Sequence, residues 1–187
     1  MLRKTLMRLC LTTGALLLTG VASVAGAAGA SAATSSPGSE AHASAQIKAA
    51  AAANNSQQIR NAAFSQCVDA PGGALNVRLK LSDCSASIGT RRWAFVPTGA
   101  ANTYFIVNVA SSLCMEVNNG TSTPGETVDE YFCNGLASEQ WVLGDGLTMR
   151  HAGTNQCLDT VGGRGSQLMQ FTCGQSSPPA AQSWVIE

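Results

Sequence analysis

Three carboxylates, Asp69, Glu116 and Asp159, each stand two residues after a cysteine. Each belongs to the same short phrase of cysteine, apolar residue, acid and a Gly- or Asn-rich pair: QCVDAPGG at 66–73, LCMEVNNG at 113–120 and NQCLDTVGG at 155–163. A carboxylate accepts charge-assisted hydrogen bonds from paired donors, and glycine lets a backbone come close to a ligand. The recurring acids are therefore candidates for binding a ligand that offers adjacent hydroxyl groups.

The same phrases have a purely structural alternative. Asp often opens a turn by accepting hydrogen bonds from backbone N–H groups, and the stretches DAPGG and DTVGG are good turn sequences without any ligand. Both interpretations of the three acids stay open at this point.

A second set of markers recurs in phase with the acids. Each first cysteine is followed by a second one and then by a tryptophan, 26, 27 and 27 residues after the first: Cys67, Cys84 and Trp93; Cys114, Cys133 and Trp141; Cys157, Cys173 and Trp184. Short alternating runs such as YFIVNV lie between turn residues, which is typical of strands and hairpins. A unit repeated three times predicts an all-β fold that closes on itself, because closure hides the edge strands.

The phrase, the later cysteine and the final Gln182-Ser183-Trp184 resemble the ricin B-type β-trefoil lectin domain over residues 59–187. The resemblance implies a β-trefoil with pseudo-threefold symmetry, with repeats at about 59–97, 104–144 and 147–187. It also implies a non-catalytic protein that binds galactose-type or related sugars, up to one per repeat. Glycans or polysaccharides are the expected partners.

The resemblance assigns roles to particular residues. Asp69, Glu116 and Asp159 match the sugar-accepting acid, and the stacking ring falls on Ser82, Tyr131 and Phe171. A further family contact, an asparagine, falls on Thr90, Ser138 and Ala181 and is missing from all repeats. The position two residues before each tryptophan, here called the brace position, holds Arg91, Glu139 and Gln182. We expect the third repeat, with Asp159, Phe171 and Gln182, to be the best site.

The other two repeats fit the family pattern less well. The second repeat has the ring Tyr131, but Glu116 is one methylene longer than Asp, so its site is doubtful. The first repeat keeps Asp69 but has no ring, and we expect its site to be lost. These departures favour an alternative function: a degenerate trefoil acting as a protein-interaction or inhibitor module, through an exposed loop at 117–127 or 174–182.

The tryptophans and the six later cysteines are expected to be structural. Trp93, Trp141 and Trp184 sit in apolar endings, so we expect core indoles whose N–H groups find an acceptor. Six cysteines allow fifteen pairings, and the repeat symmetry selects Cys67–Cys84, Cys114–Cys133 and Cys157–Cys173. A zinc site would need clustered Cys or His ligands, which the sequence lacks, so no metal and no cofactor is predicted.

No catalytic residue is predicted. The chain has two histidines, His42 and His151, and no nucleophile-elbow, zinc-protease or phosphate-loop motif. Glu116 and Asp159 belong to different repeats, which puts them beyond the separation of a glycosidase pair. The formal net charge of zero argues against a nucleic-acid partner.

The N-terminal 32 residues have the pattern of a secretory signal peptide. Arg3, Lys4 and Arg8 precede an apolar run that ends in small residues, with a cleavage site expected after Ala32. Removal leaves an even number of cysteines, which favours disulfides in a secreted, extracellular protein. The alternative is an uncleaved membrane anchor. Residues 33–58 are Ala- and Ser-rich and predict a linker or disordered tail, in which AQIKAAAAA could form a short helix.

Overall fold

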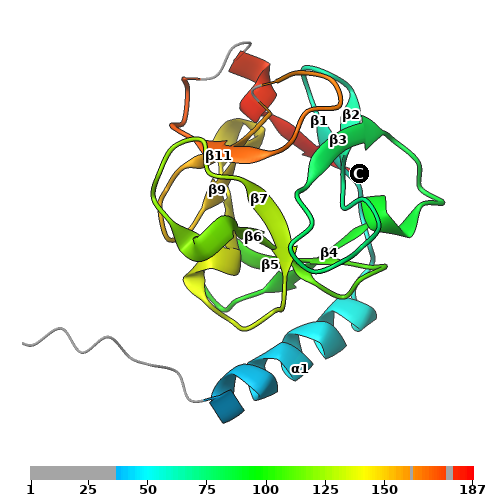
Figure 1. Ribbon diagram of the computed structural model, residues 1–187, viewed down its shortest axis with the longest axis vertical. Coiled ribbons are helices and arrows are strands. Elements are labelled where there is room, and N and C mark those ends of the chain that lie inside the picture. Colours follow the sequence, from blue (N-terminus) through cyan, green and yellow to red (C-terminus); the bar gives the residue numbers. More distant parts are fainter. Residues whose placement is uncertain (1–36, 161, 176–178) are drawn as a thin grey trace, which may run out of the picture. The chain divides into compact units, whose positions relative to one another are not determined.

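The computed structural model describes residues 37–160, 162–175 and 179–187. The predicted signal segment and residues 176–178 of one predicted loop lie outside the described residues. The described part contains one α-helix, α1 (Pro37–Ala53), and short strands (Figure 1). The strands are β1 (Ile59–Asn61), β2 (Gln66–Asp69), β3 (Lys80–Asp83), β4 (Trp93–Pro97), β5 (Thr103–Asn108), β6 (Cys114–Val117), β7 (Val128–Tyr131), β8 (Gln140–Leu143), β9 (Met149–His151), β10 (Cys157–Asp159), β11 (Met169–Phe171) and β12 (Trp184–Ile186). Single 3-10 turns are η1 (Gly89–Arg91), η2 (Asn118–Gly120), η3 (Ala137–Glu139), η4 (Asp145–Leu147) and η5 (Pro179–Gln182).

The strands form three units of four, which confirms the all-β trefoil predicted from the sequence. The middle two strands of each unit pair as an antiparallel hairpin: β2 with β3, β6 with β7 and β10 with β11. The outer strands pair with one another, β1 with β12, β4 with β5 and β8 with β5 and β9. The first and last strands close the ring, with Ile59 opposite Ile186 and Asn61 opposite Trp184.

The three units meet at a cyclic set of backbone hydrogen bonds. Leu79 N–H donates to Val128 O at 2.9 Å, Val128 N–H to Leu168 O at 3.1 Å, and Leu168 N–H to Leu79 O at 2.8 Å. All three side chains are fully buried. No unit can satisfy these groups alone, so the pseudosymmetry predicted from the repeat is built into the centre of the fold.

The core gathers one tryptophan from each repeat. Trp93, Trp141 and Trp184 are buried together with aliphatic residues from every unit, among them Ile59, Ile106 and Leu158. Each indole N–H donates to a backbone carbonyl of its own repeat, so the buried polar atom is satisfied. The prediction of core tryptophans is therefore confirmed.

The cysteines pair as Cys67–Cys84, Cys114–Cys133 and Cys157–Cys173. This is the pairing that repeat symmetry selects. Each disulfide ties the start of a hairpin to the residues just after it, and closes a loop of 16 to 19 residues. In the chain-entropy model a loop of this length stabilises the fold by roughly 3 kcal/mol.

The Ala-rich segment before the first strand differs from the predicted linker or disordered tail. Residues 37–53 form the regular helix α1, which lies against β4 and β5 (Figure 1). Ile47 is buried against Val96, Phe105 and Val107. Alanine has the highest helix propensity, and this one large apolar side chain gives the helix a docking point that composition does not reveal. No helix of the described residues combines the length and apolar character needed to cross a bilayer.

Candidate functional site

The backbone next to each of the three acids is held by the same contact. Asp69 and Asp159 end β2 and β10, and Glu116 is the third residue of β6. The tryptophan of each repeat donates its indole N–H to the carbonyl of the residue just before the acid: Trp93 to Val68 at 3.1 Å, Trp141 to Met115 at 3.0 Å and Trp184 to Leu158 at 3.0 Å. The core tryptophan therefore positions the backbone that carries each acid.

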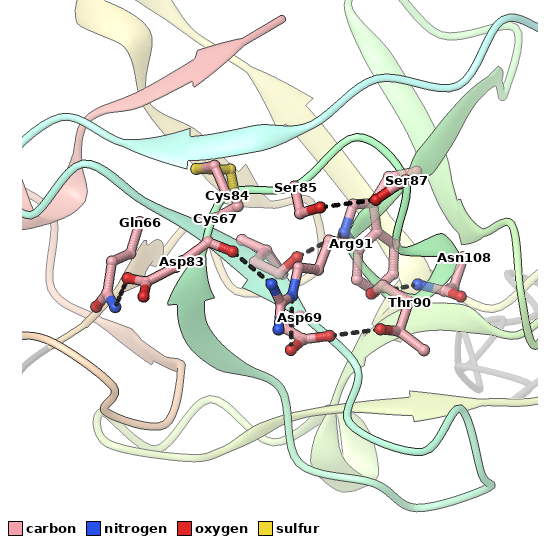
Figure 2. Close-up of polar contacts among 12 residues, drawn as sticks. Gln66, Cys67, Asp69, Asp83, Cys84, Ser85, Ser87, Thr90, Arg91 and Asn108 are labelled. Carbon is pink, nitrogen blue, oxygen red and sulfur yellow. Dashed lines mark hydrogen bonds and ion pairs between the residues drawn. A yellow bond between two sulfur atoms is a disulfide. The ribbon is translucent and has the colours of Figure 1, made fainter.

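In the first repeat, the protein itself satisfies the acid. The Asp69 carboxylate accepts a hydrogen bond from Thr90 Oγ1 at 2.7 Å and pairs with Arg91 Nε at 3.0 Å (Figure 2). Arg91 also donates to the backbone carbonyl of Asp83. Ser82, at the predicted ring position, offers no aromatic face. These contacts use both oxygens of Asp69.

The pairing changes the charge state of Asp69. Burial by itself would raise the pKa of this carboxyl, but hydrogen bonds from Thr90, Ser82 and Arg91 and the Arg91 charge lower it below its ordinary value of 3.8. Asp69 is only 4% exposed, so the ion pair replaces the water that the carboxylate has lost.

We expect Arg91→Ala to destabilise the protein by about 2 kcal/mol at pH 7, because it leaves a buried carboxylate without its cation. Since a depressed pKa stabilises the folded state only above the ordinary value, this difference should disappear as the pH falls below 3.8. Chemical denaturation at pH 7 and pH 3 measures it. Arg60→Ala is the matched control, because Arg60 forms an exposed pair with Glu187 and should change stability by less than about 1 kcal/mol. Equal losses for both variants at pH 7 would contradict the role of Arg91.

In the third repeat, the residue at the brace position also hydrogen-bonds to the acid. Gln182 Nε2 donates to Asp159 Oδ2 at 2.7 Å and to Thr172 O at 3.0 Å, while its Oε1 accepts from Gly174 N–H. Asp159 is 0% exposed, and its Oδ1 is buried without a partner among the described residues. Phe171, the predicted ring, is half-buried on β11. Acid and brace are thus brought together as predicted, but the carboxylate does not reach the surface.

In the second repeat, the brace position holds a second acid. Glu139 is fully buried and accepts backbone hydrogen bonds from Asn134 and Gly135 at 2.8 to 3.1 Å. An ionised glutamate cannot donate to Glu116 as Gln182 donates to Asp159. The hydrogen bond that Glu116 does receive comes from Ser138 Oγ, at 3.4 Å to Oε2. Among the described residues, Glu116 Oε1 has no hydrogen-bond partner.

This acid faces a cavity of about 380 Å³. Its lining includes Glu116, the Tyr131 side chain and the residues of η2, with further polar residues from neighbouring loops: Asn76, Asn134 and Ser138. Gly120 of η2 has a φ of 59°, and a Cβ on it would meet the Ser138 Cβ at 3.2 Å. Glycine at this position therefore lets the turn pack against the serine that contacts Glu116. The second repeat, doubtful from the sequence, offers an acid and a ring on one open pocket.

Burial raises the pKa of Glu116 to about 7, and the Asp129 charge raises it further while the Ser138 hydrogen bond lowers it. Burial also raises the pKa of Glu139 to about 7, with a further contribution from Glu116, against the two backbone hydrogen bonds that lower it. Two carboxyl groups in one repeat, neither paired with a cation of the described part of the chain, therefore have pKa values raised to near neutrality.

The sequence analysis missed one repeated structural residue. Six positions before the first cysteine of each repeat stand Asn61, Asn108 and His151, all buried. Asn61 donates to Ala181 O at 2.8 Å and Asn108 to Thr90 O at 2.9 Å, so each joins its turn to the end of another repeat. Aligning the repeats upstream of the cysteines would have revealed the two asparagines. Asn118 and Asn119 belong to the repeated phrase but were not assigned to a site, and the lining residue Asn134, which carries no repeated signal, was missed.

The comparison with known families agrees with this geometry. Residues 89–171 match the model of the ricin-type beta-trefoil lectin domain-like family. The match contains the whole second repeat, and it confirms the resemblance on which the sequence analysis relied. Over these residues the chain is therefore similar to a ricin-type β-trefoil lectin-like domain. Among curated proteins, none matches the chain significantly in sequence.

Solved structures with the same fold are distant in sequence. The designed threefold symmetric protein ThreeFoil aligns with a TM-score of 0.63 at 17% identity, covering 70% of this chain and 96% of that chain. A Polyporus squamosus lectin, bound to a human-type influenza-binding epitope, aligns with 0.64 at 14%, covering 71% and 48%. The C-half of an earthworm R-type lectin, in complex with GalNAc, aligns with 0.54 at 13%, covering 71% and 98%. This chain spans about half of the Polyporus lectin, and such identities establish the fold alone.

Proposed function

We propose that the protein is an extracellular, non-catalytic carbohydrate-binding module whose main site is the cavity of the second repeat. The observation that carries the proposal is the exposure of Glu116 and Tyr131 to one cavity of about 380 Å³. Pockets for small ligands begin at roughly 300 Å³. The three disulfides support an extracellular location, because such bonds persist in oxidising compartments.

The lining suits the two faces of a sugar ring. Glu116 accepts hydrogen bonds from adjacent hydroxyls through the oxygen that has no partner among the described residues. The amides of Asn118, Asn119 and Asn134 can both donate and accept. Tyr131 gives an aromatic surface for the apolar C–H face. The other two acids are already engaged by Arg91 and Gln182.

A second candidate site is the third repeat, for galactose-type sugars as the family resemblance implies. Phe171 supports it as a partly exposed ring. A ligand would have to reach a buried Asp159, which requires Gln182 to release the carboxylate. For this reason we rank the third repeat below the second, in the reverse of the order that the sequence suggested.

The proposal predicts that Tyr131→Ala lowers glycan affinity at least about tenfold, because it removes the stacking face. Phe171→Ala is the matched control in the third repeat and should leave affinity within about twofold. The measurement is a glycan array on the folded, oxidised protein, followed by titration calorimetry with the best ligand. Both rings are partly exposed, so both variants should fold.

The outcomes separate the candidates. Loss of binding in Phe171→Ala alone would assign the function to the third repeat. Absence of any glycan binding would contradict carbohydrate binding altogether and would support the alternative of a protein-interaction module.

A further inference from the structure

The second-repeat cavity differs from a neutral sugar pocket in its charge. Its acid lacks the intramolecular partner that the other two repeats supply. In the first repeat Arg91 neutralises Asp69, and in the third Gln182 donates to Asp159. In the second repeat, the equivalent position holds the carboxyl group of Glu139, which cannot serve either role when ionised.

The described residues of the cavity wall include acids but no cation. None of the described residues that line the cavity is Lys, Arg or His, whereas Glu40 of α1 lines it together with Glu116. Asp129 lies opposite Glu116 across the β6–β7 pair, and its charge acts on Glu116. Arg78 is a nearby cation, but its charge acts on Asp129. The backbones of Arg78 and Asp129 form an isolated antiparallel β-bridge.

The unpaired oxygen is well placed for a ligand. Glu116 is 8% exposed, and the part that remains accessible faces the cavity. A buried carboxylate without a cation is costly unless a ligand supplies the missing charge. Tyr131 stands at the same cavity, and the face of an aromatic ring attracts a cation as well as C–H groups.

The cavity continues along the aromatic edge. A second cavity of about 340 Å³ is lined by Tyr131, Phe132, Asn134 and residues of α1, so it shares part of its wall with the first. The rings of Tyr131 and Phe132 pack edge to face with centroids 5.6 Å apart, and Phe132 is 51% exposed. Two adjoining cavities with exposed rings fit an oligosaccharide better than a single sugar.

We infer that the second-repeat site takes a cationic oligosaccharide built of 2-amino sugars, with one ammonium group on Glu116 and the next sugar against Tyr131 and Phe132. The inference rests on the proposed function and names the substrate class of the same site. Both the amino group and the neighbouring hydroxyl donate to the carboxylate, and an N-acetylated sugar offers no charge to it.

The test compares an oligomer of 2-amino-2-deoxyglucose with the same oligomer fully N-acetylated, by calorimetric titration at pH 6. We expect the amino form to bind at least about tenfold more tightly, with an advantage that decreases as salt is raised. Glu116→Gln should weaken binding of the amino form at least about tenfold and that of the acetylated form by less than about threefold. Asp83→Asn is the control, since it removes an equal charge from an exposed carboxylate of the first repeat.

A pH series adds a readout that a structural role would not give. The pKa of Glu116 is raised to about 7, so at lower pH the carboxyl must lose its proton when the ammonium group binds. Affinity for the amino oligomer should therefore rise at least about tenfold from pH 5 to pH 7, and Glu116→Gln should abolish most of this rise. Glu139 and Asp129 remain in the variant, so any residual pH dependence of the affinity measures their share.

The outcomes are distinguishable from those of the proposed function. Equal or tighter binding of the acetylated oligomer, still lost in Tyr131→Ala, would overturn the inference and leave the carbohydrate-binding function intact. Binding of the amino oligomer that Glu116→Gln does not change would also overturn it. If neither this pair nor any glycan on the array binds, both proposals fail.

Discussion

The protein should be more stable at pH 5 than at pH 8, by at least about 3 kcal/mol in the free energy of unfolding. The cause is a set of glutamates that the fold buries without an ion pair to any cation in residues 37–160, 162–175 or 179–187. Glu130 is the clearest case: it is fully buried, its Oε1 accepts from Ser111 Oγ at 2.6 Å, and its Oε2 has no partner among the described residues.

The sign follows from the direction of the pKa shifts. Burial raises the pKa of Glu130 from 4.5 to about 7, with a further contribution from Asp69 and an opposing one from the Ser111 hydrogen bond. A group whose pKa is higher in the folded state stabilises it fully below the ordinary value. That stabilisation is lost as the pH rises through about 7. For Glu130 alone, this change corresponds to roughly 3 kcal/mol.

Other buried groups act in the same window. Burial raises the pKa values of Glu116 and Glu139 to about 7. His151 opposes them, since burial lowers its pKa and stability from the neutral ring is lost as the pH falls below 6.5. Three glutamates against one histidine leave a net gain in stability toward pH 5.

The measurement is denaturant unfolding at pH 5 and pH 8 at equal ionic strength. Glu130→Gln should reduce the difference in unfolding free energy between pH 5 and pH 8 by roughly 3 kcal/mol. The amide keeps the shape of the side chain and does not ionise. Glu187→Gln, which changes an exposed acid, is the control and should leave the profile unchanged. If the free energy of unfolding of the wild-type protein rises from pH 5 to pH 8, the predicted cost of ionising the buried glutamates is wrong.

Trp141→Ala should destabilise the protein by about 3–5 kcal/mol, the range for removing a buried aromatic side chain. Trp141 is fully buried, contacts the ring of His151 with centroids 5.6 Å apart, and donates to Met115 O. In a domain of this size the loss corresponds to a fall in Tm of roughly 6–20 °C, which calorimetry at pH 6 measures.

The conservative variant separates packing from positioning. Trp141→Phe keeps most of the apolar volume but leaves the Met115 carbonyl without its donor, at a cost of roughly 1–3 kcal/mol. Because that carbonyl fixes the backbone next to Glu116, glycan affinity should fall as well. Trp184→Phe is the matched control in the third repeat: it should cost similar stability and leave affinity unchanged if the second repeat is the main site. A stable Trp141→Ala protein would rule out the core role.

The fold was predictable because its cause is repeated in the chain. One cysteine phrase and one tryptophan, three times in phase, required three equivalent units, and the strands, the central hydrogen-bond ring and the disulfide pairing follow from that symmetry. The docking of helix α1 was not predictable from composition, since it depends on Ile47, its one large apolar side chain, which packs with Ala50 and Ala51 against β4 and β5.

The sequence by itself determined the trefoil, the core role of the tryptophans and the three positions at which an acid stands. It ranked those acids by likeness to a family pattern, and that ranking placed Asp159 first. The tertiary structure decided their exposure. Arg91 and Gln182 reach back over about twenty residues of sequence to bind Asp69 and Asp159, whereas an ionised Glu139 has no hydrogen to donate to Glu116. Whether a carboxylate is available to a ligand depends on which donor the folded chain brings to it. The residue type at the acid position does not reveal which donor that is.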